Sequence, residues 1–339
     1  MTNKEQYTLW ASSQPTLPLS MQPWWMDAVT AGKEWDVILV RKKDIFPQED
    51  NVQTAEDESP IVAALPYLFR RKWFMTYIVM PQQTQIGGIY CPPPSEDEST
   101  DSVQLRYQKI VTFVVAKLAE MQLWYYYQQF PIGSPFPRLF KQYGFHVDER
   151  VTYRINDLSN LDKVIDAFSK NKKRQLQKAL SLHADMTLTP EQFYQFHAQC
   201  MLKQKRSLSY SREFFLVLER KSARLNQSQI LAIKDADGQL CAAAYLVWDQ
   251  ETMYYLIPCY NPDLKQSGAS ALLVLEAIKL AREKGVLFDF EGSMNRGIAH
   301  HYRQFGSTPT AYYSVRHYYK KLFWLANIYN KLRNYKYGI

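Results

Sequence analysis

The chain has 339 residues, a length that suits two domains better than one, and its 46% of apolar residues is enough for ordinary buried cores. Its 41 basic and 33 acidic residues give a net charge of +8, which favours an anionic partner such as a nucleotide, RNA or a lipid headgroup. No apolar run approaches the roughly 20 residues that span a bilayer, and the polar stretch MTNKEQYTLWASSQ excludes a signal peptide. The four cysteines show no CxxC pair and no metal-ligand spacing, so we expect reduced thiols in a soluble, cytoplasmic protein.

The first half of the chain reads as a set of strands around one long helix. Apolar residues at three- and four-residue steps predict an amphipathic helix over 103–121. A polar, acidic loop is expected over 44–60, and a segment punctuated by Pro and Gly is expected to be irregular over 80–90. Strands are expected at 35–43, 61–72, 123–130 and 151–155, with a hairpin partner after residue 72 and a short helix ending at LFKQYGF (139–145).

The second half repeats this order. A hairpin with Asp237 and Gly238 as its turn is expected over 230–249, and an amphipathic helix over 267–285 ends on a glycine. Further strands are expected at 251–261, 286–293 and 311–317, with a short helix at 297–306. The stretch FKQYGF also aligns with YRQFGS at an offset of 162, at the same structural place in each half. We infer that the chain contains one α/β unit twice.

Charged segments separate and follow the two copies. Helices are expected at 160–183, 190–202 and 211–225, and a basic, aromatic helix from residue 318 onward. The first of these helices carries a basic run, which is typical of a solvated helix face but could instead steer a phosphate-rich donor or acceptor. The run consists of Lys170, Lys172, Lys173, Arg174 and Lys178.

Two carboxylates lie in the expected strand VLFDFEGS (286–293). Alternation along a strand places Asp289, Glu291 and Ser293 on one face and the two phenylalanines on the other. Buried carboxylates need a reason, either an ion pair or general-base work on an attacking amine, for which Glu291 is the candidate. Further ligands at suitable spacing do not accompany His300 and His301, so no metal site is expected.

The order of elements and one loop resemble the GNAT superfamily of acyltransferases. The stretch KQSGAS corresponds to the acyl-donor loop of that family, Arg/Gln-x-x-Gly-x-Gly/Ala, with Lys265 at the basic position, Gly268 at the invariant one and Ser270 at the small one. The resemblance implies that these residues bind the donor, since backbone amides at a helix N-terminus suit a pyrophosphate. A plain packing role for a glycine at a helix start is the alternative.

A second motif, NRGIAHHYRQFGS, keeps the spacing of Asn, Tyr and Gly found in many GNAT acetyltransferases. The matching residues are Asn295, Tyr302 and Gly306. The resemblance implies that Asn295 bonds the pantetheine arm of the donor and that Tyr302 protonates the leaving thiolate, a task that suits a neutral phenol. The alternative is that Tyr302 is a half-buried helix aromatic.

The whole chain is similar to the Fem-type transferases, which join two GNAT domains and add amino acids to peptidoglycan precursors from aminoacyl-tRNA. The suggestive stretches are FDFEGSMNRGIAHHYRQFG, SKNKKRQLQKAL, and ALPYLFRRK followed by MPQQTQIGG. The resemblance implies an α/β fold with α+β mixed sheets in two tandem GNAT-like domains. These are 1–158 on the acceptor side, and 159–339 with the donor loop and the C-terminal basic helix. The long helical arm of the best-known members has no counterpart in the sequence, which favours a CoA donor over tRNA.

The first copy has no donor loop, because the stretch PPPSEDESTD before its long helix is acidic and would repel a pyrophosphate. Its kinked segment is expected to face the acceptor instead, together with one carboxylate of the second copy. These acceptor-side residues are Gln83, Thr84, Gly87, Gly88 and Asp289.

The expected function is therefore acyl transfer. An acyl or aminoacyl group would move from acyl-CoA or aminoacyl-tRNA, used as a co-substrate, to an amine of a small molecule or a cell-envelope precursor. No tightly bound cofactor is expected, and a peripheral contact with a membrane surface is a further expected partner. The alternative is a non-catalytic protein that binds a ligand or a partner on a duplicated GNAT fold.

Overall fold

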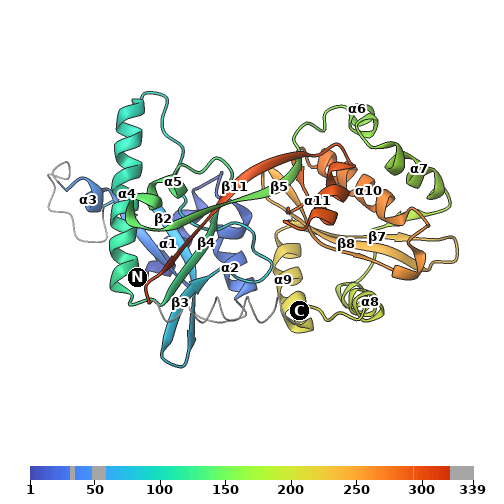
Figure 1. The fold of residues 1–339 in the computed structure, drawn as a ribbon, viewed down its shortest axis with the longest axis horizontal. Coiled ribbons are helices and arrows are strands. Elements are labelled where there is room, and N and C mark those ends of the chain that lie inside the picture. The colour runs from blue at the N-terminus through green and yellow to red at the C-terminus, as the bar shows by residue number, and fades with distance from the viewer. Residues whose placement is uncertain (31–34, 48–58, 293, 321–339) are drawn as a thin grey trace. The chain divides into compact units, whose positions relative to one another are not determined.

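The chain folds into two compact units, shown as a ribbon in Figure 1. One unit comprises Met1–Arg150 together with Tyr312–Ile339, and the other comprises Val151–Ala311. These bounds differ from the expected domains 1–158 and 159–339, because two long strands each run through both units. The two strands are β5 (His146–Ile155) and β11 (Thr308–Tyr318). The computed structural model describes residues 1–30, 35–47, 59–292 and 294–320.

The first unit holds seven helices and four strands of its own among its described residues, besides its parts of β5 and β11. In chain order they are α1 (Asn3–Ser12), the 3-10 helix η1 (Leu19–Met21), α2 (Pro23–Val29), β1 (Trp35–Arg41), α3 (Lys42–Ile45), β2 (Ile61–Lys72), β3 (Met75–Val79), α4 (Thr100–Glu120), β4 (Tyr125–Phe130), α5 (Phe136–Phe140) and the 3-10 helix η2 (Lys141–Tyr143).

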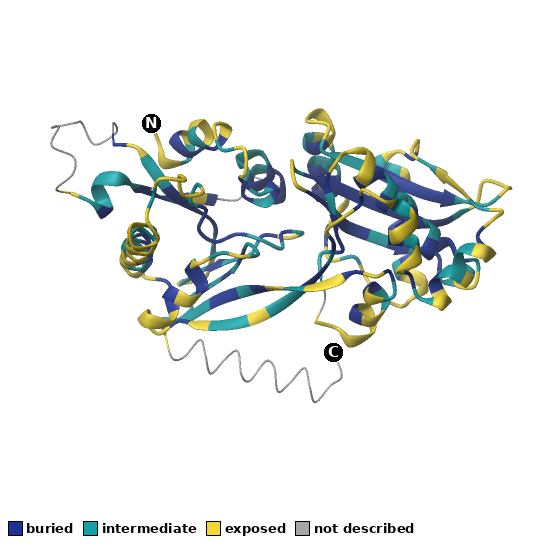
Figure 2. Ribbon diagram, turned by 90° about the horizontal axis from the view of Figure 1, so that it is seen from above, coloured by how far each residue is buried: buried dark blue, intermediate teal, exposed yellow. Residues whose placement is uncertain are grey.

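The sheet of the first unit has the strand order β1-β2-β3-β4-β11. Its neighbours pair antiparallel except β3 and β4, which are parallel. Alternation along β1 sends Ile38 and Val40 into the core that α4 covers, and Val37 and Leu39 into the core beneath α1 and α2. Both faces of this sheet are therefore covered, and Figure 2 shows the outer side of α4 exposed.

The second unit contains the remaining elements, again in chain order. They are α6 (Leu161–Asp166), α7 (Lys170–Lys178), β6 (His183–Asp185), α8 (Pro190–Lys203), α9 (Arg212–Arg224), β7 (Ser228–Lys234), β8 (Leu240–Trp248), β9 (Thr252–Tyr260), η3 (Pro262–Leu264), α10 (Ala269–Glu283), β10 (Leu287–Asp289) and α11 (Arg296–Arg303).

The sheet of the second unit has the order β5-β10-β9-β8-β7-β6. Its strand β10 pairs parallel with β9 and antiparallel with β5, and the other pairs are antiparallel. Alternation along β8 again sorts the core, since Ala242 and Ala244 pack on the α10 side. The ring of Tyr245 lies on the other side, 5.2 Å from Phe215 of α9. No helix among the residues that the structure describes is long and apolar enough to cross a membrane.

Two sequence expectations about this unit are wrong. The expected single helix over 160–183 breaks into α6 and α7, because Ser169 begins a new helix by accepting a hydrogen bond from the backbone N–H of Lys172 (3.2 Å). The backbone N–H of Ser169 donates to the carbonyl of Gln304 (2.8 Å), which fixes the break. The expected strand over 286–293 ends at Asp289, because Glu291 has a left-handed φ of +61°.

The echo between the two halves marks equivalent places in the fold. Gly144 and Gly306 each follow a short helix in the left-handed conformation, with φ of +76° and +72°. The long strands β5 and β11 begin just after them. The inferred duplication is thereby confirmed. Three expected features lie wholly or largely outside the described residues, namely the acidic loop over 44–60, of which 48–58 are not described, Ser293, and the basic helix beyond Lys320.

Candidate active site

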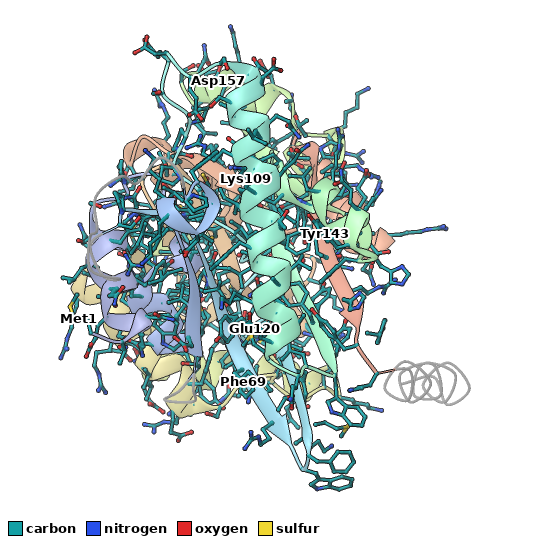
Figure 3. All side chains as sticks on the ribbon, turned by 90° about the vertical axis from the view of Figure 1, so that its left-hand side faces the viewer. Met1, Phe69, Lys109, Glu120, Tyr143 and Asp157 are labelled. Atoms are coloured by element: carbon teal, nitrogen blue, oxygen red, sulfur yellow. The ribbon has the colours of Figure 1, made fainter. Side chains whose placement is uncertain are left out.

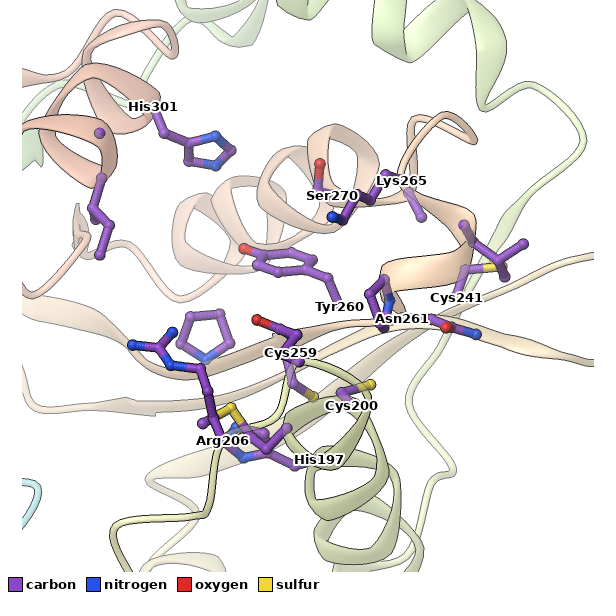
Figure 4. A pocket seen from close by; sticks show the side chains of 18 of the residues that line it. His197, Cys200, Arg206, Cys241, Cys259, Tyr260, Asn261, Lys265, Ser270 and His301 are labelled. Atoms are coloured by element: carbon purple, nitrogen blue, oxygen red, sulfur yellow. The ribbon is translucent and has the colours of Figure 1, made fainter. Parts of the chain in front are cut away.

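A pocket of about 500 Å³ opens in the second unit at the end of β9. The end of β9 and the loop after it form its floor, with α8 on one side and the first turn of α10 and the helix α11 on the other. Figure 4 shows the ring of Tyr260 in the middle of this space, Ser270 at the start of α10 and the ring of His301 turned inward. A helix N-terminus, cationic side chains and tyrosine hydroxyls therefore surround one cavity.

Tyr302, the expected general acid, lines this pocket from α11. The residue is 9% exposed, and its ring stacks on Phe290 at a centroid distance of 4.5 Å. Burial, together with the nearby carboxylates of Glu291 and Asp289, raises the pKa of the Tyr302 hydroxyl to about 12. The phenol therefore keeps its proton at neutral pH, as a general acid must.

Glu291, the expected general base, follows Phe290 just after the end of β10. The residue is partly exposed, and burial of its carboxyl group raises the pKa well above the ordinary value, with the charge of Asp289 as a second cause. Among the described residues that line the pocket, Tyr302 is present and Glu291 is not. The charge of an ionised Glu291 would still act on the Tyr302 hydroxyl, since it is one cause of the raised pKa of Tyr302. The raised pKa of Glu291 itself favours the protonated carboxyl group.

Asp289, the other carboxylate, is 1% exposed and has several partners. It accepts hydrogen bonds from the hydroxyl of Thr152 (2.5 Å) and from the backbone N–H of Glu291 (2.7 Å), and it lies 3.2 Å from Nε of Arg154. Burial nevertheless raises the pKa of Asp289, while the Thr152 bond and the Arg154 charge oppose the shift. The burial of Asp289 thus has a structural reason, because its carboxylate holds the left-handed turn at Glu291. An acceptor role stays a prediction.

The expected donor loop lies at the N-terminus of α10, and its members lie in different surroundings. Lys265 and Ser270 line the pocket. Gly268 is buried, has a φ of +82°, and a Cβ placed there would overlap the backbone carbonyl oxygen of Gln175 in α7. The glycine is thus required by the close approach of α7 to the start of α10.

Asn295, which the resemblance assigns to the pantetheine arm, is the N-cap of α11. Its side-chain oxygen accepts the backbone N–H groups of Gly297 (2.9 Å) and Ile298 (3.3 Å). Asn295 is exposed and does not appear among the described residues that line the pocket, whereas Gly297 and Ile298 do. The cap therefore fixes the helix that presents Tyr302, and direct contact with a donor stays a prediction.

A buried pair beside the pocket was missed from the sequence. Lys172, read as part of a solvated basic face, is 2% exposed, and its Nζ lies 3.2 Å from Nδ1 of His301 and 4.6 Å from the ring of Phe305. Burial lowers the pKa of Lys172 to about 8 and that of His301 to about 4. An ammonium only donates, so Nδ1 accepts and Nε2 carries the ring hydrogen, without a hydrogen-bond partner among the described residues.

The sequence shows that a lysine and a histidine are present, but it does not show that they lie close together in the fold. Lys172 and His301 are 129 residues apart, and neither a helical face nor a strand pattern relates them. The described residues contain no group of three or more His, Cys, Asp or Glu side chains that could hold a metal ion.

The other four expected acceptor residues lie in the first unit, where several have packing roles. The hydroxyl of Thr84 is buried and accepts a hydrogen bond from the indole N–H of Trp25 (3.0 Å). A Cβ at Gly88, where φ is +80°, would lie 2.6 Å from the ring of Phe130. The N–H of Gly87 donates to the carbonyl of Gln129 (2.7 Å), and Gln83 is partly exposed with a φ of +51°. Contact with an acceptor stays a prediction for all four.

Comparison with known proteins bears on both the second unit and the whole chain. Residues 166–303 match the model of the acetyltransferase (GNAT) domain family. A crystal structure of FemX superposes with a TM-score of 0.61 over 92% of this chain and 96% of that chain, at 11% identity. A tandem GNAT protein from the clavulanic acid biosynthesis pathway gives a TM-score of 0.51 over 93% of both chains, at 11% identity. The chain has a tandem GNAT fold.

A further solved structure is similar over nearly the same extent of this chain. It is a conserved protein of unknown function from Bacteroides thetaiotaomicron, with a TM-score of 0.57, 9% identity, and coverage of 93% of this chain and 96% of that chain. No curated protein sequence matches the chain. At sequence identities of 9% to 11%, these likenesses show the fold of the chain and not its substrates.

Proposed function

We propose that this tandem GNAT protein is an N-acyltransferase whose acyl donor binds in the pocket of the second unit. The observation that carries the proposal is the meeting of three groups around one cavity: the first turn of α10 with Ser270, the cation of Lys265, and the hydroxyl of Tyr302. Amides at a helix N-terminus and a lysine suit the phosphates of a donor. A phenol that stays protonated suits the departing sulfur.

In the proposed reaction the nitrogen of an amine attacks the carbonyl carbon of a thioester. The C–S bond breaks, the new C–N bond remains, and the leaving thiolate takes the proton of Tyr302. The proton released by the amine passes to Glu291, which acts only in its ionised form. Because burial raises the pKa of Glu291, this step becomes faster as the pH rises.

A CoA thioester is the donor we favour over aminoacyl-tRNA. The spacing of Asn295 and Tyr302 resembles that of acetyl-CoA-dependent family members, and the sequence has no counterpart of the long arm of the best-known Fem-type members. The proposed acceptor is an amine of a small molecule or a cell-envelope precursor, with the first unit and Asp289 on its side.

Substitution of Ser270 by Asp tests the donor site without endangering the fold. Ser270 is the second residue of α10, where an acidic side chain stabilises the helix, so Ser270→Asp should keep or raise the melting temperature. The added carboxylate would meet the donor phosphates and should weaken CoA binding at least about tenfold, as measured by calorimetric titration. A matched substitution, Ser267→Asp, lies before the helix and outside the described pocket lining.

The second candidate, a non-catalytic binding protein, predicts different outcomes. It allows CoA or another ligand to bind the purified protein, but it predicts no turnover by the wild type, so Tyr302→Phe would have no turnover to lose. Unaltered CoA affinity in Ser270→Asp would contradict the donor site itself. Mass spectrometry of the purified protein for bound CoA is the quickest first measurement.

A further inference from the structure

The hairpin of β2 and β3 extends beyond its neighbours in the sheet of the first unit. The pairing of β2 with β1 ends at Leu68, and the pairing of β3 with β4 begins at Tyr77. Between these points the two strands pair only with each other, down to Lys72 and Met75. Figure 3 shows ring side chains projecting from the end of this hairpin, beyond Phe69.

Two large aromatic residues form the turn of this hairpin. Trp73 is 80% exposed and Phe74 is 70% exposed. Trp73 also has a φ of +56°, a conformation that a tight hairpin turn normally gives to Gly, Asn or Asp. A bulky aromatic residue in that position costs stability, and most of its side chain stays exposed to solvent. Such a local conflict is expected where a surface residue serves an external contact.

Three consecutive cations lie directly behind the turn. Arg70, Arg71 and Lys72 make no ion pair with any residue that the structure describes. The sequence from 61 to 95 contains no Asp or Glu at all, so no acidic neighbour along the chain offsets them. We define these three cations together with Trp73 and Phe74 as the hairpin tip.

The hairpin is held firmly to the rest of the unit at Thr76, which pairs with Arg71 close behind the turn. The carbonyl of Thr76 accepts the backbone N–H of Trp124 (2.7 Å), and the hydroxyl of Thr76 donates to the carbonyl of Gln122 (3.0 Å). The ring of Phe74 lies 5.4 Å from that of the half-buried Trp124. A groove of about 770 Å³ runs along this contact. The hairpin tip is therefore presented on a fixed support.

We propose that the hairpin tip docks the protein on the surface of an anionic lipid bilayer. Aromatic residues favour the boundary between headgroups and acyl chains, and cations behind them meet the lipid phosphates. The register places the three cations at the first to third residue pairs behind the turn, a depth of roughly 3 to 10 Å at about 3.3 Å per residue. That layering fits the depth to which interfacial segments insert.

The order of the layers favours a bilayer over RNA. RNA-binding surfaces stack bases on aromatic rings that lie within a positively charged groove. In the hairpin tip the rings are outermost and the charges lie behind them. In a bilayer the charged headgroups are outermost and the apolar acyl chains lie deeper. An inserted hairpin tip would therefore place its rings among the acyl chains and its cations among the headgroups.

The proposal is tested with the full chain in a vesicle co-sedimentation assay. The vesicles contain phosphatidylcholine alone or phosphatidylcholine mixed with phosphatidylglycerol. We expect binding to the mixed vesicles that weakens as salt is raised. Replacing Arg70, Arg71 and Lys72 by Gln should weaken binding roughly a hundredfold, since each cation contributes roughly fivefold at an anionic surface. Trp73→Ser with Phe74→Ser should weaken it at least about tenfold.

Matched controls exist elsewhere on the chain. Lys170, Arg174 and Lys178 are exposed on α7, so changing all three to Gln removes the same charge from another surface. Leu180 and Leu202 are 80% and 75% exposed, so changing both to Ser removes a similar exposed apolar area. We expect both control variants to bind mixed vesicles as the wild type does. Unchanged melting temperatures of all variants confirm that they are folded.

Three results would overturn the proposal. The first is no binding of the wild type to mixed vesicles, and the second is equal loss in the α7 controls. The third is a loss of self-association or of transfer-RNA binding in the hairpin variants while vesicle binding stays intact. That last result would assign the hairpin tip to a second copy of this chain or to RNA.

Discussion

Gly268 has two possible roles, one in helix packing and one in the donor loop. Its replacement by Ala distinguishes these roles quantitatively. The residue has a φ of +82°, and its missing Cβ leaves room for the carbonyl of Gln175 at the end of α7. The added methyl group of Ala would overlap a backbone atom, which cannot turn away as a long side chain can. Either α7 or the start of α10 must move.

Two costs add at this position. A left-handed φ costs a non-glycine residue about 1 to 2 kcal/mol. Overpacking against a rigid neighbour costs a further 1 to 3 kcal/mol or so. Gly268→Ala should therefore lower the free energy of unfolding by about 2 to 5 kcal/mol. Gly285, just after the other end of α10, supplies the control, because it has a φ of +71° and nothing within 4 Å of its would-be Cβ. Gly285→Ala should cost only the conformational part, about 1 to 2 kcal/mol.

The assay is urea unfolding of both variants beside the wild type, followed by circular dichroism. At a typical m-value of about 2 kcal/mol/M, Gly268→Ala should shift the midpoint at least about 0.5 M further than Gly285→Ala. Equal shifts in the two variants would refute the claim that the approach of α7 requires this glycine. CoA titration of the folded Gly268→Ala protein completes the test, since a packing glycine predicts destabilisation with little change in donor affinity.

The remaining predictions concern ionisable groups of the second unit. Tyr302→Phe keeps the stacked ring and should lower turnover by roughly 10²- to 10⁴-fold with little change in donor affinity, and wild-type turnover would exclude the phenol as general acid. Wild-type kcat/KM should rise with pH as Glu291 loses its proton, over a pH range above that of an ordinary glutamate because burial raises the pKa of Glu291, and Glu291→Gln should lack that rise. Burial lowers the pKa of His197 from 6.5 to about 4, so the unfolded chain takes up the proton first and stability falls as the pH drops from about 6.5 to 4. His197→Gln should reduce that loss by up to about 3 kcal/mol in urea titrations at pH 7 and pH 4.5, and an unchanged loss would contradict a buried neutral imidazole.

The sequence predicted those parts of the fold that have a local signature. The strand β2 was expected over 61–72 and spans those residues, and α4 was expected over 103–121 and spans Thr100–Glu120, because alternation and helical periodicity are written into adjacent residues. The break between α6 and α7 was missed, because its cause is a tertiary hydrogen bond from Ser169 to Gln304, 135 positions away. The passage of β5 and β11 through both units was missed for the same reason.

The candidate site was predictable only as a set of residue types. The motif spacing placed Tyr302 and Ser270 in one region, and both line the pocket. It could not tell that Asn295 is an N-cap, because capping and ligand binding use the same amide side chain. It also assumed that alternation continues past Asp289, and a left-handed residue ends that pattern without a local warning, since Glu291 is neither Gly nor Asn.

The basic segment of α7 brings the packing and donor-site interpretations together. Its exposed cations, such as Lys170 and Arg174, form the solvated face that the charge pattern indicates. Lys172 on the same helix is buried against α11 and bonds His301, which lines the pocket, while the last turn of the helix fills the space at Gly268. The helix α7 therefore contacts both α10 and α11, the two elements that form one side of the pocket. A glycine required for packing at this point still positions the N-terminal turn of α10, because the close approach of α7 is what fixes that turn beside Tyr302.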